Sequence, residues 1–235
     1  MTWISYAQNG EDVRLRRAFK NQTTGFYIDI GANHPVNLSV TKHFYDNGWA
    51  GINIEPAPEP FALIQRDRKS DININVGCSN YHGKSILHTS SGEHSVFSSF
   101  DDEHCSIAKK KGCTFDDIIV NVTTLVDICT RYVNNRQIEF ISIDVEGHER
   151  QVLEGANFNH FRPRVLLVEA VLPNQIPTHE QWEHLILSHG YTFAVFDGLN
   201  RWYVRREDEH LIPIIALSPN VFDDYIPHGS STGAL

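Results

Sequence analysis

Four acidic residues stand at the ends of apolar, strand-like runs: Asp29, Glu55, Asp144 and Glu169. Ligands of open α/β sheets bind at the carboxyl ends of the strands, so we expect these carboxylates to face one cleft. A single acid at such a position usually caps the helix that follows. Four of them together favour a ligand that is cationic or rich in hydroxyl groups.

The turn after the first of these strands, Asp29–Asn33, contains a single glycine, Gly31. A pyrophosphate needs several glycines for close approach to the backbone, so this turn disfavours a dinucleotide. A nucleoside with a zwitterionic amino-acid tail needs only one tight turn and hydrogen-bonding groups. Glu55 suits the paired hydroxyls of a ribose, because a carboxylate can accept both hydrogen bonds.

Apolar runs alternate with amphipathic stretches along the chain, a pattern typical of β-α units around a parallel sheet. We expect the last two strands to form an antiparallel pair through residues 198–200. The predicted strands are 25–30, 51–55, 71–76, 118–122, 140–144, 165–169, 191–197 and 201–204. The predicted helices are 38–47, one ending near Asp67, 124–134, 149–154 and 178–189.

The chain reads as a single domain, residues 1–217, with two additions and a tail. Residues 1–24 are predicted to form an N-terminal lid. Residues 77–117 break the β-α rhythm, and two β-prone pieces, 84–89 and 95–100, indicate a β-hairpin insertion near the site. Residues 218–235 show little periodicity, which predicts a loosely held tail.

The composition excludes several classes of protein. The 235 residues carry 20 Lys and Arg against 29 Asp and Glu, a net charge of −9, which argues against a general nucleic-acid-binding surface. No signal peptide and no apolar run of about 20 residues is present, so we expect no integral membrane segment. The four cysteines match no zinc or redox motif, which predicts reduced thiols in a cytoplasmic protein.

An ordered series of motifs resembles the FkbM-type S-adenosylmethionine-dependent methyltransferases over nearly the whole chain. The strongest match is Ile141–Glu149, and the others are Ser5–Asp12, Tyr27–Asn33, Gly48–Pro56, Thr124–Asp127 and Val152–Ala156. The resemblance implies an α/β, class I methyltransferase (Rossmann-like) fold. That fold has a mostly parallel seven-stranded sheet whose last strand is antiparallel. The implied cofactor is S-adenosyl-L-methionine.

The resemblance also implies roles for individual residues. The first turn would line the methionine side of the cofactor, Glu55 would hold the ribose, and Ser79 would border the adenine. His34 and Pro35 depart from relatives that have a small residue after this turn, which leaves the shape of the loop open. The cofactor-binding residues expected by analogy are Gln8, Asn9, Asp29, Gly31, Ala32, Asn33, Glu55, Pro56, Ser79 and Asp144.

Methyl transfer to a hydroxyl oxygen needs orientation of the acceptor and a base or a metal within reach of its proton. The candidate catalytic residues lie beside the carboxyl end of the predicted strand 140–144; they are Asp144, Glu146 and His148. His148 has the most suitable ordinary pKa for a base, but it could also be a residue at the rim of the site. Asp144 and Glu169 are candidate ligands of Mg²⁺, with Glu146 or Asp197; alternatively, Glu169 caps a turn. The histidines of the insertion, His82, His88, His94 and His104, could line the acceptor pocket or face solvent.

The segment Phe196–Val204 resembles relatives encoded with glycan biosynthesis, which predicts O-methylation of a sugar or glycan precursor. The same segment also reads as an ordinary glycine-containing hairpin. The predicted acceptor-binding residues are Glu169, Asp197, Asn200 and Arg201. Three alternatives stay open: methyl transfer to a phosphoryl oxygen or another small molecule, a nucleotide-dependent oxidoreductase or epimerase, and a ligand-binding module without catalysis.

Overall fold

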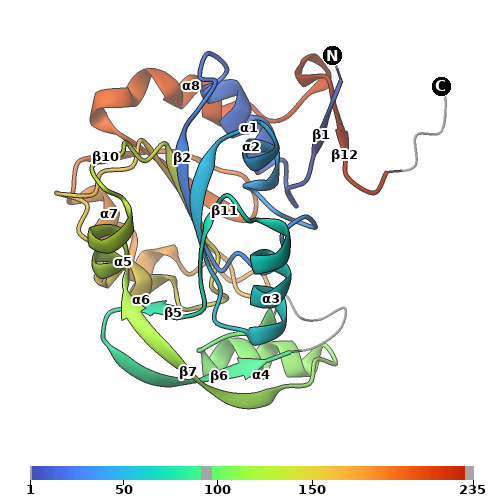
Figure 1. Cartoon of the computed structure of the whole chain (residues 1–235), viewed down its shortest axis with the longest axis vertical. Coiled ribbons are helices and arrows are strands. Elements are labelled where there is room, and N and C mark those ends of the chain that lie inside the picture. Colours follow the sequence, from blue (N-terminus) through green and yellow to red (C-terminus); the bar gives the residue numbers. More distant parts are fainter. Residues whose placement is uncertain (1, 91–96, 231–235) are drawn as a thin grey trace.

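The central element of the fold is a mostly parallel sheet, seen in a computed structural model that describes residues 2–90 and 97–230 (Figure 1). Within these residues, seven strands lie in the order β10-β11-β9-β8-β2-β3-β4, and β11 runs antiparallel to both neighbours. This confirms the predicted seven-stranded sheet with an antiparallel last strand. The strands are β2 Phe26–Ile30, β3 Ala50–Ile54, β4 Ile72–Ile74, β8 Phe140–Ile143, β9 Val165–Glu169, β10 Tyr191–Phe196 and β11 Asn200–Arg205.

Helices cover both faces of this sheet, which explains why β2, β8 and β9 are buried at every position. Alternate side chains serve opposite faces. Ile28 and Ile30 pack with residues of α5, α6 and α7, whereas Tyr27 packs with residues of α1, α2 and α8. These helices are α1 Glu11–Ala18, α2 Lys42–Asp46, α5 Leu125–Tyr132, α6 Glu149–Glu154, α7 Glu183–Leu187 and α8 Ile212–Ala216; α3 is Pro58–Asp67.

A second, smaller sheet lies at the lower end of the molecule in Figure 1, in the order β5-β7-β6. Its strands are β5 Gly77–Ser79, β6 Gly83–Thr89 and β7 Asp116–Thr124. The antiparallel insertion is therefore present, but β6 pairs with β7 rather than with residues 95–100. Residues 95 and 96 lie outside the described residues, and Ser99 makes an isolated bridge to His88. The predicted strand 118–122 is part of this sheet, not of the main one.

The insertion also contains a helix that we did not predict, α4 Asp102–Lys110. Asp101 caps its first turn by accepting a hydrogen bond from the His104 backbone N–H. Its buried face consists of His104, Cys105 and Ala108. A histidine and a cysteine are weak signals for an apolar helix face, so the sequence pattern did not reveal it.

Two predicted helices are shorter than expected. The helix predicted at 38–47 begins only at Lys42, and Leu38 has a left-handed backbone (φ 58°) that a helix cannot contain. The stretch predicted as 178–189 divides into a 3₁₀ turn, η2 His179–Gln181, and α7, because Trp182 (φ −137°) leaves the helical region.

The prediction of a loosely held tail from residue 218 is wrong for residues 218–230. The strand β12 Tyr225–Pro227 pairs in parallel with β1 Trp3–Ser5, so the two ends of the chain lie side by side (Figure 1). Just before β12 lies a 3₁₀ turn, η4 Val221–Asp223, and the Asp223 carboxylate forms an ion pair with Arg17 at 2.6 Å. Polar and backbone contacts, which leave no hydrophobic period, hold this segment. Residues 231–235 lie outside the described residues.

The segment Arg206–Leu211 forms a further 3₁₀ stretch, η3, that leads into α8. Among the described residues, no helix combines the length and the apolar character needed to cross a bilayer.

Candidate functional site

A cavity opens at the carboxyl ends of β2, β3 and β8, where the strand-end acids converge. Its lining includes nine of the predicted site residues: Gln8, Asp29, Gly31, Ala32, Asn33, Glu55, Pro56, Asp144 and Glu146. The parallel register explains this convergence, because Ile30 pairs with both Ile54 and Ile143, so three turns leave the sheet at one level.

Gly31 allows the first turn to pass directly against the end of β8. Its φ is +83°, and a Cβ at this position would lie 1.7 Å from the carbonyl oxygen of Asp144. The N–H groups of Gly31 and Ala32 both donate to the carbonyl of Ile54, at 3.0 and 3.2 Å. Only glycine fits here, and the loop is fixed between its two neighbouring strands.

The two acids on the β2 and β3 side of the cavity already have hydrogen-bond donors. Asp29 accepts from the Thr41 hydroxyl at 2.8 Å. Glu55 accepts from the backbone N–H groups of Asn33 at 2.9 Å and Ala57 at 2.8 Å. Burial raises the pKa of Asp29 to about 6 and that of Glu55 to about 7. These bonds hold each carboxylate in one orientation and leave lone pairs free to accept from a ligand.

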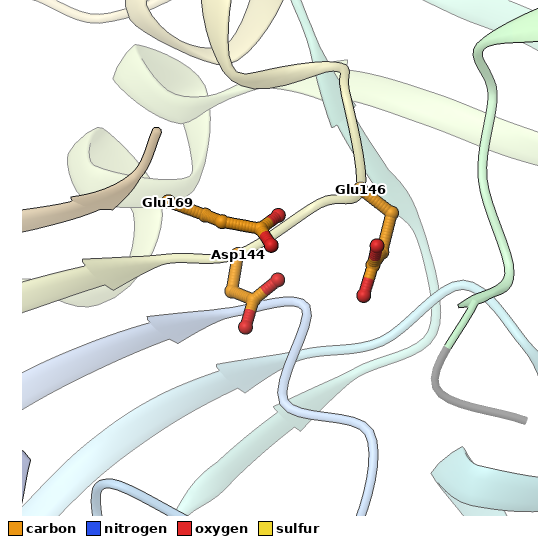
Figure 2. A group of neighbouring side chains, drawn as sticks. All are labelled: Asp144, Glu146 and Glu169. Atoms are coloured by element: carbon orange, nitrogen blue, oxygen red, sulfur yellow. The ribbon is translucent and has the colours of Figure 1, made fainter. Parts of the chain in front are cut away.

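Asp144, Glu146 and Glu169 form a cluster in which one carboxylate oxygen of each lies within 4.8 Å of the others. Figure 2 shows the three side chains gathered beyond the ends of β8 and β9, and we call them the acid cluster. Burial raises the pKa of all three, and the neighbouring carboxylates raise those of Glu146 and Glu169 further. Asp144 Oδ1 is buried without a hydrogen-bond partner among the described residues.

The turn that carries Glu146 is strained and firmly held. Glu146 has a left-handed backbone (φ 54°), which costs a non-glycine residue about 1 kcal/mol or more. The Ser99 hydroxyl donates to the Glu146 carbonyl at 2.5 Å. Glu149 accepts from the N–H groups of Val145 and Gly147, at 3.2 and 3.1 Å. Such strain, fixed from both sides, is characteristic of functional sites.

The match to a known domain family decides the class of protein. A family model of the methyltransferase FkbM domain matches residues 29–193, well over half of the chain. The chain belongs to the FkbM methyltransferase family. It is therefore a methyltransferase that depends on S-adenosylmethionine.

Solved methyltransferases are similar to this FkbM methyltransferase only at a distance. A TehB-like S-adenosylmethionine-dependent methyltransferase from Corynebacterium glutamicum is 7% identical, with a TM-score of 0.45 over 83% of this chain and 88% of that one. A precorrin-6y C5,15-methyltransferase from Geobacter metallireducens is 11% identical, with a TM-score of 0.43 over 83% and 86%. No curated protein matches the sequence. The assignment therefore rests on the family match and the strand order.

Two predicted residues of the FkbM methyltransferase, Ser79 and His148, contact each other. The Ser79 hydroxyl lies 3.0 Å from His148 Nε2, and the imidazole packs against Phe100 at 5.2 Å between ring centroids. Phe100 and Cys78 line the cavity, whereas Ser79 and His148 are not part of its lining. Burial lowers the pKa of His148 to about 4, so the ring is neutral at pH 7. This geometry does not favour His148 as the base.

Of four further predicted residues, Asn9, Asp197 and Asn200 form a junction between the N-terminal segment and the turn from β10 to β11, whereas Arg201 contacts α7. Asn9 donates to Asp197 at 3.1 Å, and Asn200 donates to Glu11 at 2.8 Å. Asp197 accepts from the backbone of its own turn, and Arg201 donates to Glu183 at 2.7 Å. None of the four lines the cavity, so their predicted roles in binding cofactor or acceptor gain no support from the geometry.

The loop after the first turn departs from the family pattern at His34, and the structure supplies a reason. His34 Nδ1 accepts hydrogen bonds from the N–H groups of Val36 at 3.0 Å and Asn37 at 2.9 Å. Burial lowers the pKa of this ring, which keeps Nδ1 free to accept. His34 thus stabilises the loop that leads to Leu38 and Ser39, both of which line the cavity.

The insertion lies near the site, as expected, but the residues that it contributes to the cavity are not the histidines named from the sequence. Leu87, Ser98 and Phe100 line the cavity. His104 is buried, with 1% of its surface exposed, beside Glu146. His82 and His88 pair with Asp127 and Asp117 at the surface, whereas His94 lies outside the described residues. No periodicity distinguishes His104 from these other histidines, so only the tertiary structure separates them.

Proposed function

We propose that this FkbM methyltransferase transfers a methyl group to a hydroxyl oxygen of a sugar or glycan precursor. The observation that carries the proposal is that two partly buried carboxylates, Asp144 and Glu146, line the same cavity as Asp29 and Glu55. One part of the cavity thus suits a nucleoside and the other offers bases to an acceptor.

The residues of the first turn and of the β3 end fit S-adenosylmethionine. Gly31 brings the loop against the strand ends, and Glu55 keeps lone pairs free for two ribose hydroxyls after accepting its two backbone N–H groups. Asp29 presents a carboxylate to the ammonium of the methionine tail. S-adenosylmethionine, when bound, supplies an electrophilic methyl group on a sulfonium.

The acid cluster supplies the chemistry that a hydroxyl acceptor needs. A hydroxyl is a poor nucleophile until its proton leaves, so a base must lie within reach of it. The raised pKa values of Asp144 and Glu146 make their carboxylates better proton acceptors than ordinary ones. In addition, carboxylates hold hydroxyl-rich ligands by accepting two hydrogen bonds at once. A phosphoryl oxygen as acceptor is less favoured, because its negative charge would meet three acids.

The decisive experiment combines transfer from labelled S-adenosylmethionine with a panel of nucleotide sugars, glycan precursors, amines and phosphorylated metabolites. We expect labelled product only with carbohydrate hydroxyls, detected by mass spectrometry. Asp144→Asn and Glu146→Gln should each lower the rate at least tenfold while S-adenosylhomocysteine binding is retained. Exclusive methylation of amines or phosphates would refute the proposed acceptor, and stabilisation by NAD but not by S-adenosylhomocysteine would refute the donor.

We also propose that the N-terminal segment closes over the cofactor and that the enzyme works in the cytoplasm on small carbohydrate substrates. Gln8 lines the cavity, and its neighbour Ala7 bridges to Leu38, which supports the first point. The second is supported by the four cysteines, all of which are unpaired and buried. Thermal unfolding of Gln8→Ala with and without S-adenosylhomocysteine tests the lid, because loss of the ligand-induced shift is expected.

A further inference from the structure

The acid cluster brings three carboxyl groups together at a place where the described residues supply no Lys or Arg partner. Among residues 2–90 and 97–230, no Lys or Arg forms an ion pair with Asp144, Glu146 or Glu169. Glu169 is 9% exposed, and the Glu146 side chain is 17% exposed. Unpaired buried carboxylates are costly, so the cluster must bind either protons or a cation.

His104 is a second, independent feature that points to a cation. Neither of its ring nitrogens has a hydrogen-bond partner among the described residues, although the residue is 99% buried. Its Nε2 lies 3.1 Å from Glu146 Oε2, in an orientation that makes no hydrogen bond. A buried, unused nitrogen therefore faces the cluster.

The backbone around Glu146 holds this arrangement at an energetic cost. The left-handed turn at Glu146 and Gly147 directs the Glu146 side chain toward Asp144 (Figure 2). Asp101 and His104 of the insertion pack close to Gly147, where a Cβ would lie 3.2 Å from the Asp101 side chain. Residues of the insertion thus pack against the turn at Gly147. The buried His104 belongs to α4, the helix that Asp101 caps.

We propose that Asp144, Glu146 and Glu169 bind one hard divalent cation, of the Mg²⁺ or Mn²⁺ class, at the acceptor side of the cavity. Carboxylate oxygens are the ligands that these ions prefer. Glu149 is not one of the three acids whose oxygens lie within 4.8 Å of one another, and its carboxylate holds the turn by accepting two backbone N–H groups. His104 Nε2, 3.1 Å from Glu146 Oε2, lies beside this group of carboxylate oxygens.

The cation would polarise the acceptor hydroxyl, and this role rests on the proposed function; the binding itself does not. Because Asp144 and Glu146 line the cavity while Glu169 does not, the ion would sit between the buried end of the cluster and the acceptor. A sugar oxygen could then complete its coordination.

The test is cation binding by the full-length protein in the absence of any acceptor. Protein freed of metal with a chelator is titrated with Mn²⁺, followed by electron paramagnetic resonance, and with Mg²⁺, followed by thermal unfolding. We expect saturable binding of about one Mn²⁺ per chain and a rise in Tm with either ion. Glu169→Gln should weaken binding at least tenfold, and Glu146→Gln provides a second variant of the cluster.

Matched controls keep the outcome interpretable. Glu154→Gln changes an acid on the same helix as Glu149 that pairs with Arg150 and Asn80 at the surface, and it should bind Mn²⁺ like the wild type. All variants should retain affinity for S-adenosylhomocysteine, which shows that they are folded. Absence of saturable binding in the wild type, or equal binding by Glu169→Gln, would overturn the inference and leave the cluster as a site of shared protons. If Mn²⁺ binds but no carbohydrate is methylated, only the proposed function fails.

Discussion

The two ends of the cavity use the same side chains in opposite ways. At the end of the cavity that we propose for the methyl donor, here called the donor end, Asp29 and Glu55 accept hydrogen bonds from a hydroxyl and from backbone N–H groups. In the acid cluster, the carboxylates of Asp144 and Glu169 face each other, and Asp144 Oδ1 has no hydrogen-bond partner in the described part of the chain. The donor end is thus fixed before a ligand arrives, whereas the acid cluster is incomplete without protons, an acceptor or a cation.

This difference has a physical cause in the backbone. The loops after β2 and β3 turn their N–H groups toward the carboxylate of Glu55. After β8, the available N–H groups of Val145 and Gly147 are taken by Glu149 instead. The carboxylates of Asp144 and Glu146 therefore face the cavity without these donors. Single substitutions can test this difference between the two ends.

The largest effect is expected from Gly31→Ala, because Gly31 lies where the first turn contacts the end of β8. A methyl group 1.7 Å from the Asp144 carbonyl must displace the loop or the end of β8, and the positive φ adds strain. We expect a loss of roughly 3 kcal/mol or more in the free energy of unfolding, together with loss of S-adenosylhomocysteine binding. Urea unfolding and calorimetry measure the two quantities.

Gly48→Ala is the matched control, because Gly48 has the same φ of +83° but no atom within 4 Å of the added Cβ. It should cost only about 1–2 kcal/mol of strain and leave binding intact. If both variants lose the same stability, the close approach of the first turn to β8 does not matter.

Next in size is the effect of Glu55→Gln on the donor end. The amide can accept only one of the two backbone N–H bonds and presents its NH₂ group to the other. Because a hydrogen bond to a charged group contributes about 1.5–3 kcal/mol, we expect S-adenosylhomocysteine affinity to fall roughly ten- to a hundredfold. Calorimetric titration measures it. The control is Glu59→Gln, which changes an exposed acid in the first turn of α3 and should bind like the wild type. An unchanged affinity in Glu55→Gln would mean that the ribose binds elsewhere.

The buried acids predict that stability falls as the pH rises. A carboxyl whose pKa is raised by folding contributes stability below its ordinary pKa and loses it as the pH passes its folded value. For Glu55 and Glu149 this window extends from about 4.5 to about 7. In chelator, we therefore expect the free energy of unfolding to decline between pH 5 and pH 8.

Glu169→Gln sharpens this prediction for the acid cluster. The amide resembles the protonated acid, so the variant should lose less stability than the wild type between pH 5 and pH 8. Urea unfolding at three pH values provides the comparison. Glu154→Gln is the control, because the pKa of Glu154 is lowered by Arg150 and its titration lies below this range. Parallel curves for Glu169→Gln and the wild type would mean that Glu169 is already ionised without cost.

The smallest effect is expected from Arg201→Ala, outside the cavity. The guanidinium pairs with Glu183 and stacks on Phe193 at 4.1 Å, in a partly exposed position. Its removal should cost about 1 kcal/mol of stability and change S-adenosylhomocysteine affinity less than twofold. Thermal unfolding and calorimetry check both numbers. A tenfold loss of affinity would restore Arg201 to the binding site predicted from the sequence.

The sequence predicted the main sheet well because its strands are apolar runs between clear turn residues. It failed where polar contacts decide the structure. The helix Asp102–Lys110 buries a histidine and a cysteine, and the segment 218–230 is held by an ion pair and a two-stranded β pairing. Neither leaves a hydrophobic period for sequence analysis to detect.

For the candidate site, position along the strands was enough to select Asp29, Glu55, Asp144 and Glu146, since strand ends in a parallel sheet meet at one edge. Strand-end position also selected Glu169, which does not line the cavity. The resemblance of the segment Phe196–Val204 selected Asp197 and Arg201, which instead satisfy a turn and a neighbouring helix. A sequence motif locates a residue along the chain, but it does not identify the group with which its side chain forms a hydrogen bond.

The sequence by itself thus determined where most strands of the main sheet lie along the chain, the single-glycine turn and the family, because these depend on local pattern and ordered motifs. Only the tertiary structure decided which carboxylates are satisfied and which are not. That distinction depends on N–H groups and side chains brought in from distant segments, such as His104 from the insertion and Ser99 beside the Glu146 turn.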